Sequence, residues 1–300
     1  MKVFLNDPIA PSAVERLRAH VELVDNFDRP EELDAIILRQ QYCPADVIRK
    51  AVRCKLIQQH GVGLDRIDVK AAEACGIPVK NTPGANSRSV AEYTVAMMLD
   101  LSRKLTAIDK KTRKGLLPRF GMPETVGNEL THKRLGLIGS GHIARHVAQI
   151  CRDGFRMEVY CHSAHRSGEE LRRMGFTPIS FRELFSVCDF VSLHCLLTPE
   201  TYHLIDRKCF DDCNPDLILI NTARGGLVDE EALYEALVSG KIGAAGLDVF
   251  ESQPPSIDNP LLSLDNFLAG MHVAGSTDEA LERTGKAVVD SVFEALGIDG

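Results

Sequence analysis

Residues 135–144 read LGLIGSGHIA. This stretch predicts a buried strand, a glycine turn and the start of a helix in succession. Leu135, Leu137 and Ile138 form a short apolar run that predicts the strand, and glycines in the turn let the backbone come close to a ligand. The pattern is G-x-G-x-x-A, which between a strand and a helix is typical of dinucleotide binding, although glycine turns also occur for structural reasons. We expect the turn and the helix start to hold a pyrophosphate through Gly139, Ser140, Gly141, His142 and Ile143.

The composition of the chain indicates a globular protein of one large or two ordinary domains. Of its 300 residues, 44% are hydrophobic and 26% are charged, which is enough to bury a sizeable core. The net charge of −7 gives no electrostatic basis for binding nucleic acid or an acidic membrane. With no signal-type segment and no apolar run near ~18 residues, we expect a cytoplasmic protein. Nine cysteines without C-x-x-C pairs fit a reducing compartment, and we expect no metal site.

Strands and helices alternate along the chain in two series, joined by a long helix expected over residues 89–105. The first series has expected strands at 2–5, 22–24, 35–38, 55–59 and 76–79. The second begins at Leu135 and continues with strands at 158–161, 190–193, 217–221, 243–247 and 267–270. This alternation predicts an α/β fold with parallel sheets that carry helices on both faces.

Further stretches place polar residues and glycines near expected strand ends: HGVGLDRIDVKAA from residue 60, NTPGANSRSVAE from 81, LHCLLTPETYHLI from 193, NTARGGLVDEEAL from 221, AAGLDVFESQP from 244 and MHVAGST from 271. Together with LGLIGSGHIA, they resemble the D-isomer-specific 2-hydroxyacid dehydrogenases in order and spacing. The resemblance implies two doubly wound parallel-sheet domains with the active site in their cleft. A Rossmann dinucleotide-binding domain of residues 91–275 would be inserted in a flavodoxin-like substrate domain of residues 1–90 and 276–300. It also implies a homodimer.

Two residues fit the chemistry of hydride transfer to a 2-oxo acid, which needs a cation for the carboxylate and carbonyl and a proton donor for the alkoxide. Arg224 follows an expected strand, at the edge where doubly wound sheets bind ligands, and its planar guanidinium matches a carboxylate. His272 takes the position of the family's acid/base histidine. A structural salt bridge for Arg224 and a structural role for His272 are the alternatives, and the surrounding motifs favour catalysis.

The sequence departs from most relatives at Gln253, where they carry a glutamate that holds the catalytic imidazole. Glu251 matches a variable position of the family, so we interpret it as a surface residue. A glutamine accepts a hydrogen bond and orients His272, but it supplies no negative charge to stabilise an imidazolium. We therefore expect carbonyl reduction to fall off at lower pH than in a glutamate-bearing relative.

Substrate contacts are expected from the first domain. The turn at Val62 and Gly63 presents backbone N–H groups to a carboxylate, and Asn86 adds a polar contact. Gln59 and His60 are further candidates for lining the pocket. We expect a small 2-oxo or 2-hydroxy acid, and prefer glyoxylate or hydroxypyruvate because no second basic cluster for a phosphate is evident.

The choice of cofactor depends on the end of the second strand of the dinucleotide domain. An NAD site usually places an acidic residue there, about 20 residues beyond the glycines. Glu158 stands at the beginning of that strand, and the family position falls at or near Ser163, with His165 and Arg166 after it. A hydroxyl and basic groups suit a 2′-phosphate, so we expect a preference for NADP(H), with NAD(H) still open. Other family positions near the nicotinamide, its ribose or its carboxamide are Thr198, Thr201, Asn221, Thr222, Ala223 and Asp248.

Two other functions stay open at this point. Formate dehydrogenases use a Gln-His pair with an arginine and an asparagine, which here would be Gln253, His272, Arg224 and Asn86. The chain would alternatively be a dinucleotide-sensing, corepressor-type binding protein in which turnover matters less. The retained Arg224 and His272 argue against that second reading.

Overall fold

A computed structural model describes residues 1–116 and 125–299 and divides into two compact units. Unit 1 comprises Met1–Ser87 and Ser276–Gly300, and unit 2 comprises Arg88–Gly275. Each unit is built on one parallel sheet with helices on both faces, so the expected α/β fold class with doubly wound sheets is confirmed. No helix of the described residues is long and apolar enough to cross a membrane.

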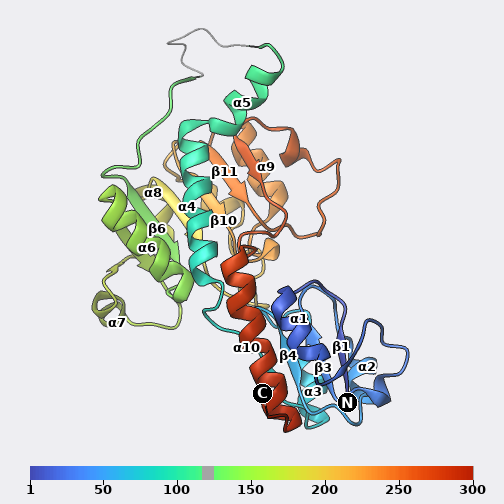
Figure 1. Ribbon diagram of the computed structural model, residues 1–300. Coiled ribbons are helices and arrows are strands. Elements are labelled where there is room, and N and C mark those ends of the chain that lie inside the picture. The colour runs from blue at the N-terminus through green and yellow to red at the C-terminus, as the bar shows by residue number, and fades with distance from the viewer. Residues whose placement is uncertain (117–124, 300) are drawn as a thin grey trace. The chain divides into compact units, whose positions relative to one another are not determined.

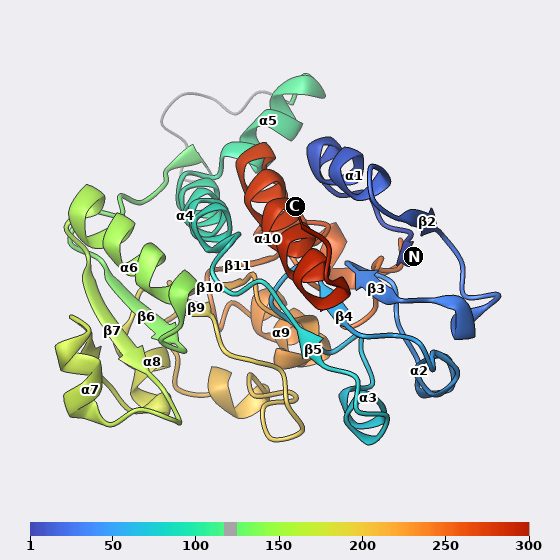
Figure 2. The same ribbon diagram turned by 60° about the horizontal axis from the view of Figure 1, so that its bottom comes forward.

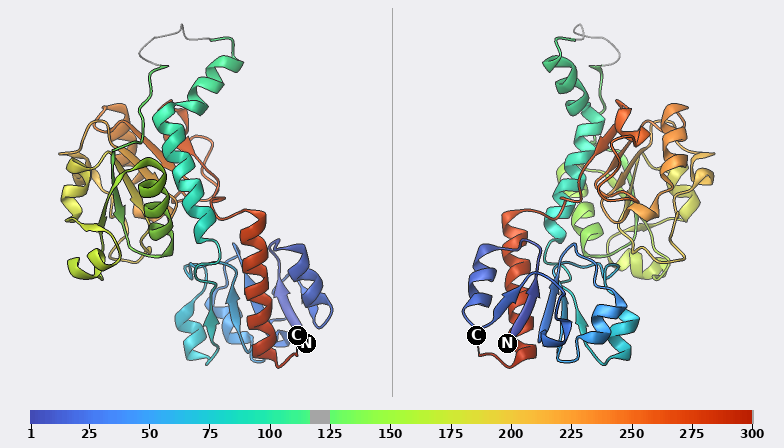
Figure 3. Two further views of the ribbon diagram at one scale, coloured as in Figure 1. Left: turned by 60° about the vertical axis from the view of Figure 1, so that its left-hand side comes forward. Right: turned by 90° about the vertical axis from the view of Figure 1, so that its right-hand side faces the viewer.

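Unit 1 has a five-stranded sheet in the order β2-β1-β3-β4-β5. The strands are β1 (Lys2–Leu5), β2 (Glu22–Val24), β3 (Ala35–Leu38), β4 (Ile57–Gln59) and β5 (Val79–Lys80). Helices α1 (Pro11–Arg18) and α10 (Asp278–Leu296) lie side by side on one face (Figure 3), and α2 (Ala45–Lys50) and α3 (Val69–Ala74) cover the other. A short 3₁₀ helix, η1 (Pro30–Glu32), precedes β3.

The two helices on the first face of unit 1 approach closely because their contact is made of small residues. A Cβ at Gly285 of α10 would lie 2.9 Å from the Cβ of Ala13 in α1. Val288 and Val292, one helical turn apart, are fully buried in the same cluster as Leu17. This burial ties the C-terminal segment to the N-terminal sheet.

Unit 2 has a seven-stranded sheet in the order β12-β11-β10-β9-β6-β7-β8. Its strands are β6 (Arg134–Ile138), β7 (Glu158–His162), β8 (Thr177–Pro178), β9 (Phe190–Leu193), β10 (Ile218–Asn221), β11 (Ala244–Leu247) and β12 (Phe267–Ala269). One face carries α4 (Ser87–Arg103), α6 (His142–Phe155) and α7 (Gly168–Arg173), and the other carries α8 (Phe181–Val187) and α9 (Glu230–Val238) (Figure 2). Helix α5 (Leu105–Arg113) follows α4 (Figure 1). The 3₁₀ helices of this unit are η3 (Arg207–Phe210), η4 (Gly225–Leu227) and η5 (Pro260–Ser263).

The order of strands in unit 2 reverses at β6, which pairs with β7 on one side and with β9 on the other. In open α/β sheets, ligands bind outside the carboxyl ends of the strands at such a reversal. The loops after β6, β7, β10, β11 and β12 are therefore the places to look for a site.

Several expected elements differ in their bounds from those observed, and for two of them one residue explains the difference. The long helix expected over 89–105 is α4, which ends at Arg103 because Lys104 adopts a left-handed conformation with φ 57° before α5 begins. The strand expected over 76–79 is only Val79–Lys80. Pro78 has no N–H for the ladder, although its carbonyl accepts from the Ile57 amide at 3.0 Å.

Candidate active site

The glycine turn between β6 and α6 leaves room for a ligand at its second glycine. Gly139 has φ 104°, and a Cβ on it would lie 2.5 Å from the carbonyl oxygen of His194. Gly141 caps α6, and a Cβ there would meet nothing within 4 Å. Backbone N–H groups at a helix start beside open space fit the pyrophosphate of a dinucleotide. Ser140 is buried in the turn, and His142 and Ile143 open the helix.

Strand β7, the second strand of unit 2 along the chain, is followed by a hydroxyl residue and not by an acid at its end near the glycine turn. His162, the last residue of β7, pairs with Ile138, and its carbonyl accepts from the Gly139 amide at 2.9 Å, so Ser163 follows beside the turn. Glu158 pairs with Arg134 at the opposite end of the strand. This placement confirms that Glu158 lies away from the turn.

The loop after that strand exposes two basic side chains. His165 and Arg166 are exposed, and the His165 amide donates to the Ser163 Oγ at 3.4 Å. The Arg166 guanidinium lies 3.9 Å from a carboxylate oxygen of Glu170 in α7. The loop thus combines a hydroxyl with basic side chains at the carboxyl end of β7.

The turn that carries Arg224 is folded by the side chain of Asn221, the last residue of β10. The Asn221 amide group donates to the Arg224 carbonyl at 2.8 Å, and its oxygen accepts from the Ala223 amide at 2.9 Å. The Arg224 guanidinium donates to the Ala223 carbonyl at 2.7 Å. Asn221 opens the NTARGG stretch and was expected, like Thr222 and Ala223, to lie near the cofactor.

The Arg224 turn packs directly against the loop that follows β11. A Cβ on Gly225 would overlap the backbone of Phe250 and Glu251. Only glycine therefore fits after Arg224 at this close approach. The contact fixes the turn of Arg224 against the loop that leads to Gln253.

The ring of His272 contacts the side chain of Gln253. Its Nδ1 lies 3.0 Å from the Gln253 Oε1, which accepts the hydrogen bond. Glu251 bonds elsewhere: His203 Nε2 lies 2.9 Å from one of its oxygens, and the Tyr202 hydroxyl donates to the other at 3.4 Å. The imidazole that the sequence singled out is therefore held by a neutral amide.

Other residues expected near the cofactor have side chains that bond within the protein. The Thr201 hydroxyl donates to the Leu196 carbonyl at 2.7 Å and accepts from the Thr198 amide at 2.7 Å, which closes the loop after β9. The Thr222 hydroxyl lies 2.9 Å from the hydroxyl of Thr94 in α4. These side chains shape the rim of the sheet.

Asp248, the first residue after β11, is only 1% exposed. Its carboxylate accepts from the amides of Val273 at 3.1 Å and Ala274 at 2.9 Å. Burial raises the pKa of Asp248, and these amides together with the Tyr93 hydroxyl oppose the rise. The carboxylate is thus directed at the loop that carries His272.

In unit 1, the loop after β4 is bonded to the residues that follow β5. Gly61 has φ 143° and donates to the Thr82 hydroxyl at 3.0 Å, and the Val62 carbonyl accepts from Asn81 at 2.7 Å. Within the part of the chain that the structure describes, no group accepts from the amides of Val62 or Gly63. Such adjacent N–H groups suit an anion.

Buried polar atoms lie at the same end of β4. Gln59 and His60 are 5% and 7% exposed, and the Gln59 amide group donates to the Arg39 carbonyl at 2.9 Å. Among residues 1–116 and 125–299, Gln59 Oε1, His60 Nε2 and Asn86 Oδ1 have no hydrogen-bond partner. Burial, and then the charge of Arg39, lowers the pKa of His60 to about 4. Its imidazole is neutral at physiological pH.

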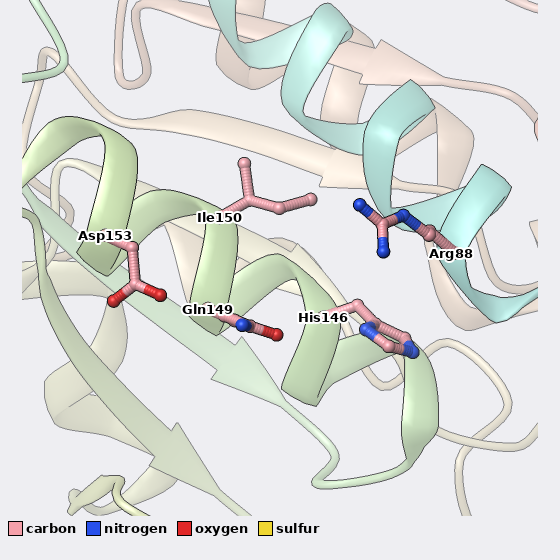
Figure 4. Close-up of a pocket in the computed structure, with 5 residues that line it drawn as sticks. All are labelled: Arg88, His146, Gln149, Ile150 and Asp153. Atoms are coloured by element: carbon pink, nitrogen blue, oxygen red, sulfur yellow. The ribbon is translucent and has the colours of Figure 1, made fainter.

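A hollow between α4 and α6 lies apart from these loops. It is lined by Arg88, His146, Gln149, Ile150 and Asp153 (Figure 4). None of the residues expected to bind cofactor or substrate lines it, and we assign it no role. Within the described residues, no group of three or more His, Cys, Asp or Glu side chains is placed to hold a metal ion.

Comparison with known proteins gives one consistent family. A family model described as D-isomer specific 2-hydroxyacid dehydrogenase, NAD binding domain, matches residues 95–274. The chain is 38% identical to the hydroxypyruvate reductase of Thermotoga maritima over 312 residues, which cover 99% of each protein. It is 37% identical to the D-3-phosphoglycerate dehydrogenase of Archaeoglobus fulgidus over 302 residues, which cover 97% of this chain and only 56% of that protein.

A solved structure covers both units. The D-lactate dehydrogenase of Aquifex aeolicus, complexed with NAD and lactic acid, matches with a TM-score of 0.88 and 29% identity, over 99% of this chain and 96% of that one.

Proposed function

Because the chain belongs to the D-isomer specific 2-hydroxyacid dehydrogenase family, we propose that it reduces a small 2-oxo acid to the D-2-hydroxy acid, with His272 as the acid/base group. Family membership makes it an NAD(P)-dependent enzyme with an NAD(P)-binding domain. The observation that carries the proposal is the 3.0 Å contact between His272 Nδ1 and Gln253 Oε1, because it fixes the orientation of an imidazole, the side chain best suited to acid/base chemistry near neutral pH.

We assign unit 2 as the dinucleotide-binding domain and unit 1 as the substrate domain. The turn of Gly139, Ser140 and Gly141 would hold the pyrophosphate, and the bound nicotinamide supplies the hydride. Arg224 binds the carboxylate of the substrate and polarises its carbonyl. His272 gives its proton to the developing alkoxide oxygen, becomes neutral and regains a proton from solvent.

The buried acceptors of unit 1 favour a substrate that carries a hydroxyl. The amides of Val62 and Gly63 would bind the substrate carboxylate, with Asn86 beside them. Gln59 Oε1 is buried without a partner within the described residues, and a hydroxyl donor would satisfy it. A site built to bond a hydroxyl rejects an analogue that lacks it. We therefore propose hydroxypyruvate over pyruvate, in line with the named relative of Thermotoga maritima.

The cofactor proposed is NADP(H). Its support is the hydroxyl of Ser163 after β7, the exposed His165 and Arg166 in the same loop, and the position of Glu158 at the far end of the strand. A hydroxyl and basic residues at the position where relatives carry the acid suit a 2′-phosphate, because the residue that would repel it is not acidic here.

The test is the initial rate of NADPH and NADH oxidation at neutral pH with hydroxypyruvate, glyoxylate and pyruvate, beside a His272→Ala control. We expect turnover with hydroxypyruvate and NADPH that the control loses. Faster turnover with NADH would keep the enzyme and refute the cofactor proposal. Full activity of the control would refute the role of His272.

The Gln253–His272 contact also favours a second candidate, formate oxidation, because that reaction uses such a pair with an arginine and an asparagine. Reduction of NAD⁺ or NADP⁺ by formate, without turnover of any 2-oxo acid, would select it. Tight dinucleotide binding without turnover of either kind would favour a sensor. We further expect a cytoplasmic homodimer, which sedimentation of the purified protein and fractionation of cells would check.

A further inference from the structure

His272 stands in a backbone conformation that its own side chain disfavours. Its φ is 57°, in the left-handed region, where a residue with a Cβ is strained. Such residues persist only where the surrounding structure holds them. The contact of the ring with Gln253 restrains the imidazole and leaves the backbone to be held by something else.

Asp248 supplies that restraint from the end of β11. Its backbone carbonyl accepts from the His272 amide at 2.6 Å. Its carboxylate accepts from the next two amides, those of Val273 and Ala274, at 3.1 and 2.9 Å. Three consecutive N–H groups of the loop are thus bonded to one buried residue.

The carboxylate is itself held by Tyr93, which comes from helix α4 on one face of the sheet. The Tyr93 hydroxyl and the Asp248 carboxylate lie together beside Gly270, where the hydroxyl faces the carboxylate as a donor. Burial, and then the charge of Asp248, raises the pKa of Tyr93, so the hydroxyl keeps its proton and stays a donor. Gly270 closes the cluster, since a Cβ on it would lie 2.8 Å from the Tyr93 oxygen and would overlap the carboxylate.

We propose that Tyr93 and Asp248 are positioning residues for His272 and act through the backbone of its loop. The inference rests on the proposed role of His272. Asp248 was expected only to contact the cofactor, and the proposal adds the role of positioning His272. Tyr93, which lies in no recognised motif, takes part in the same role. The order of transmission is Tyr93 hydroxyl, Asp248 carboxylate, amides of Val273 and Ala274, and then the backbone of His272.

The test is Tyr93→Phe, which removes one hydroxyl and keeps the ring. Tyr160→Phe is the matched control, because the Tyr160 hydroxyl also donates to a carboxylate, that of Glu158 at 2.9 Å, at the end of β7 away from the glycine turn. We expect Tyr93→Phe to lower kcat about tenfold, the equivalent of ~1.4 kcal/mol, as for a lost hydrogen bond to a charged group. The KM for the nicotinamide cofactor should stay unchanged.

Hydrogen exchange supplies a readout that does not depend on turnover. The amides of Val273 and Ala274 should exchange faster in Tyr93→Phe and at the wild-type rate in Tyr160→Phe. Asp248→Asn is the second variant. Its side-chain NH₂ group is a donor and cannot accept from the backbone N–H groups of Val273 and Ala274. We therefore expect a greater loss of kcat than in Tyr93→Phe.

Each outcome decides for or against the proposal. A lower melting temperature of Tyr93→Phe with wild-type kcat and wild-type exchange at Val273 and Ala274 would overturn it. Faster exchange with wild-type kcat would also overturn it, because the loop would move without consequence for the reaction. A His272→Ala variant that retains full kcat would refute the proposed function itself, and the exchange result would still report whether Tyr93 holds the loop.

Discussion

Replacing Gln253 with glutamate should extend carbonyl reduction to higher pH. The Gln253 Oε1 already lies 3.0 Å from His272 Nδ1, so a carboxylate oxygen in its place would meet the imidazole without any movement of the chain. Reduction consumes the proton of His272, and a neighbouring negative charge favours the protonated ring. The alkaline limb of the rate profile should therefore move upward.

The size of the shift follows from the distance and the exposure of the pair. Gln253 is exposed and His272 is half-buried, so the surroundings are close to water. Two unit charges at 4 Å in water interact by about 1 kcal/mol, and 1.36 kcal/mol corresponds to one pH unit, which gives an upward shift of ~0.7–1 pH unit. Salt should reduce the shift, because the pair is accessible to screening ions.

The assay is the pH dependence of kcat/KM for hydroxypyruvate reduction by the wild type and by Gln253→Glu. Ser252→Glu is the matched control, since it adds the same charge one residue away without the hydrogen bond to His272. If the alkaline limb of kcat/KM lay at the same pH in the wild type and in Gln253→Glu, the reasoning would be refuted. An equal shift in the control would attribute the effect to net charge and not to this contact.

Three further perturbations address the cofactor, the turn and stability. Ser163→Asp should change the ratio of kcat/KM for NADPH over NADH by at least about fivefold in favour of NADH, because a carboxylate repels a 2′-phosphate by ~1–4 kcal/mol at contact distance. An unchanged ratio would contradict the placement of that phosphate. Gly139→Ala should abolish dinucleotide binding in a fluorescence titration, since its Cβ would lie 2.5 Å from the His194 carbonyl at φ 104°; wild-type affinity would count against it. His60 has its pKa lowered to about 4, so its contribution to stability is complete above pH ~6.5 and is lost as the pH falls toward 4, a total of about 3 kcal/mol. His60→Gln should flatten the free energy of unfolding in urea between those pH values, and a slope equal to that of the wild type would refute this account.

The fold could be predicted from sequence because its decisive signals are local. The apolar run before Gly139 and the later strand runs each identify a strand on their own, and the alternation with helices implies the parallel sheets. The errors lie where one residue's backbone decides the outcome. Lys104 ends α4 with a positive φ, and a lysine side chain does not predict that conformation.

The site was predictable only where a motif marks it. Arg224, Gln253 and His272 stand at recognisable positions, and the contact of Gln253 with His272 follows from the same pattern. Tyr93 carries no such mark, because helical periodicity in α4 says which face is buried and not which carboxylate lies beneath it. Its partner, Asp248, lies in β11's loop, and only the packing of α4 on the sheet brings the two together.

The structure separates the position of His272 from its charge. Asp248 and Tyr93 hold the backbone of the loop, whereas the bond from Gln253 is made to the imidazole ring of His272. Residue 253 can therefore differ from the family glutamate without displacing the imidazole. A change at Tyr93 should then lower kcat at every pH, and a change at Gln253 should move the alkaline limb with little effect on the plateau. If both variants moved the alkaline limb equally, the contacts that position His272 would also control its protonation. The separate roles inferred for Tyr93 and Gln253 would then be wrong.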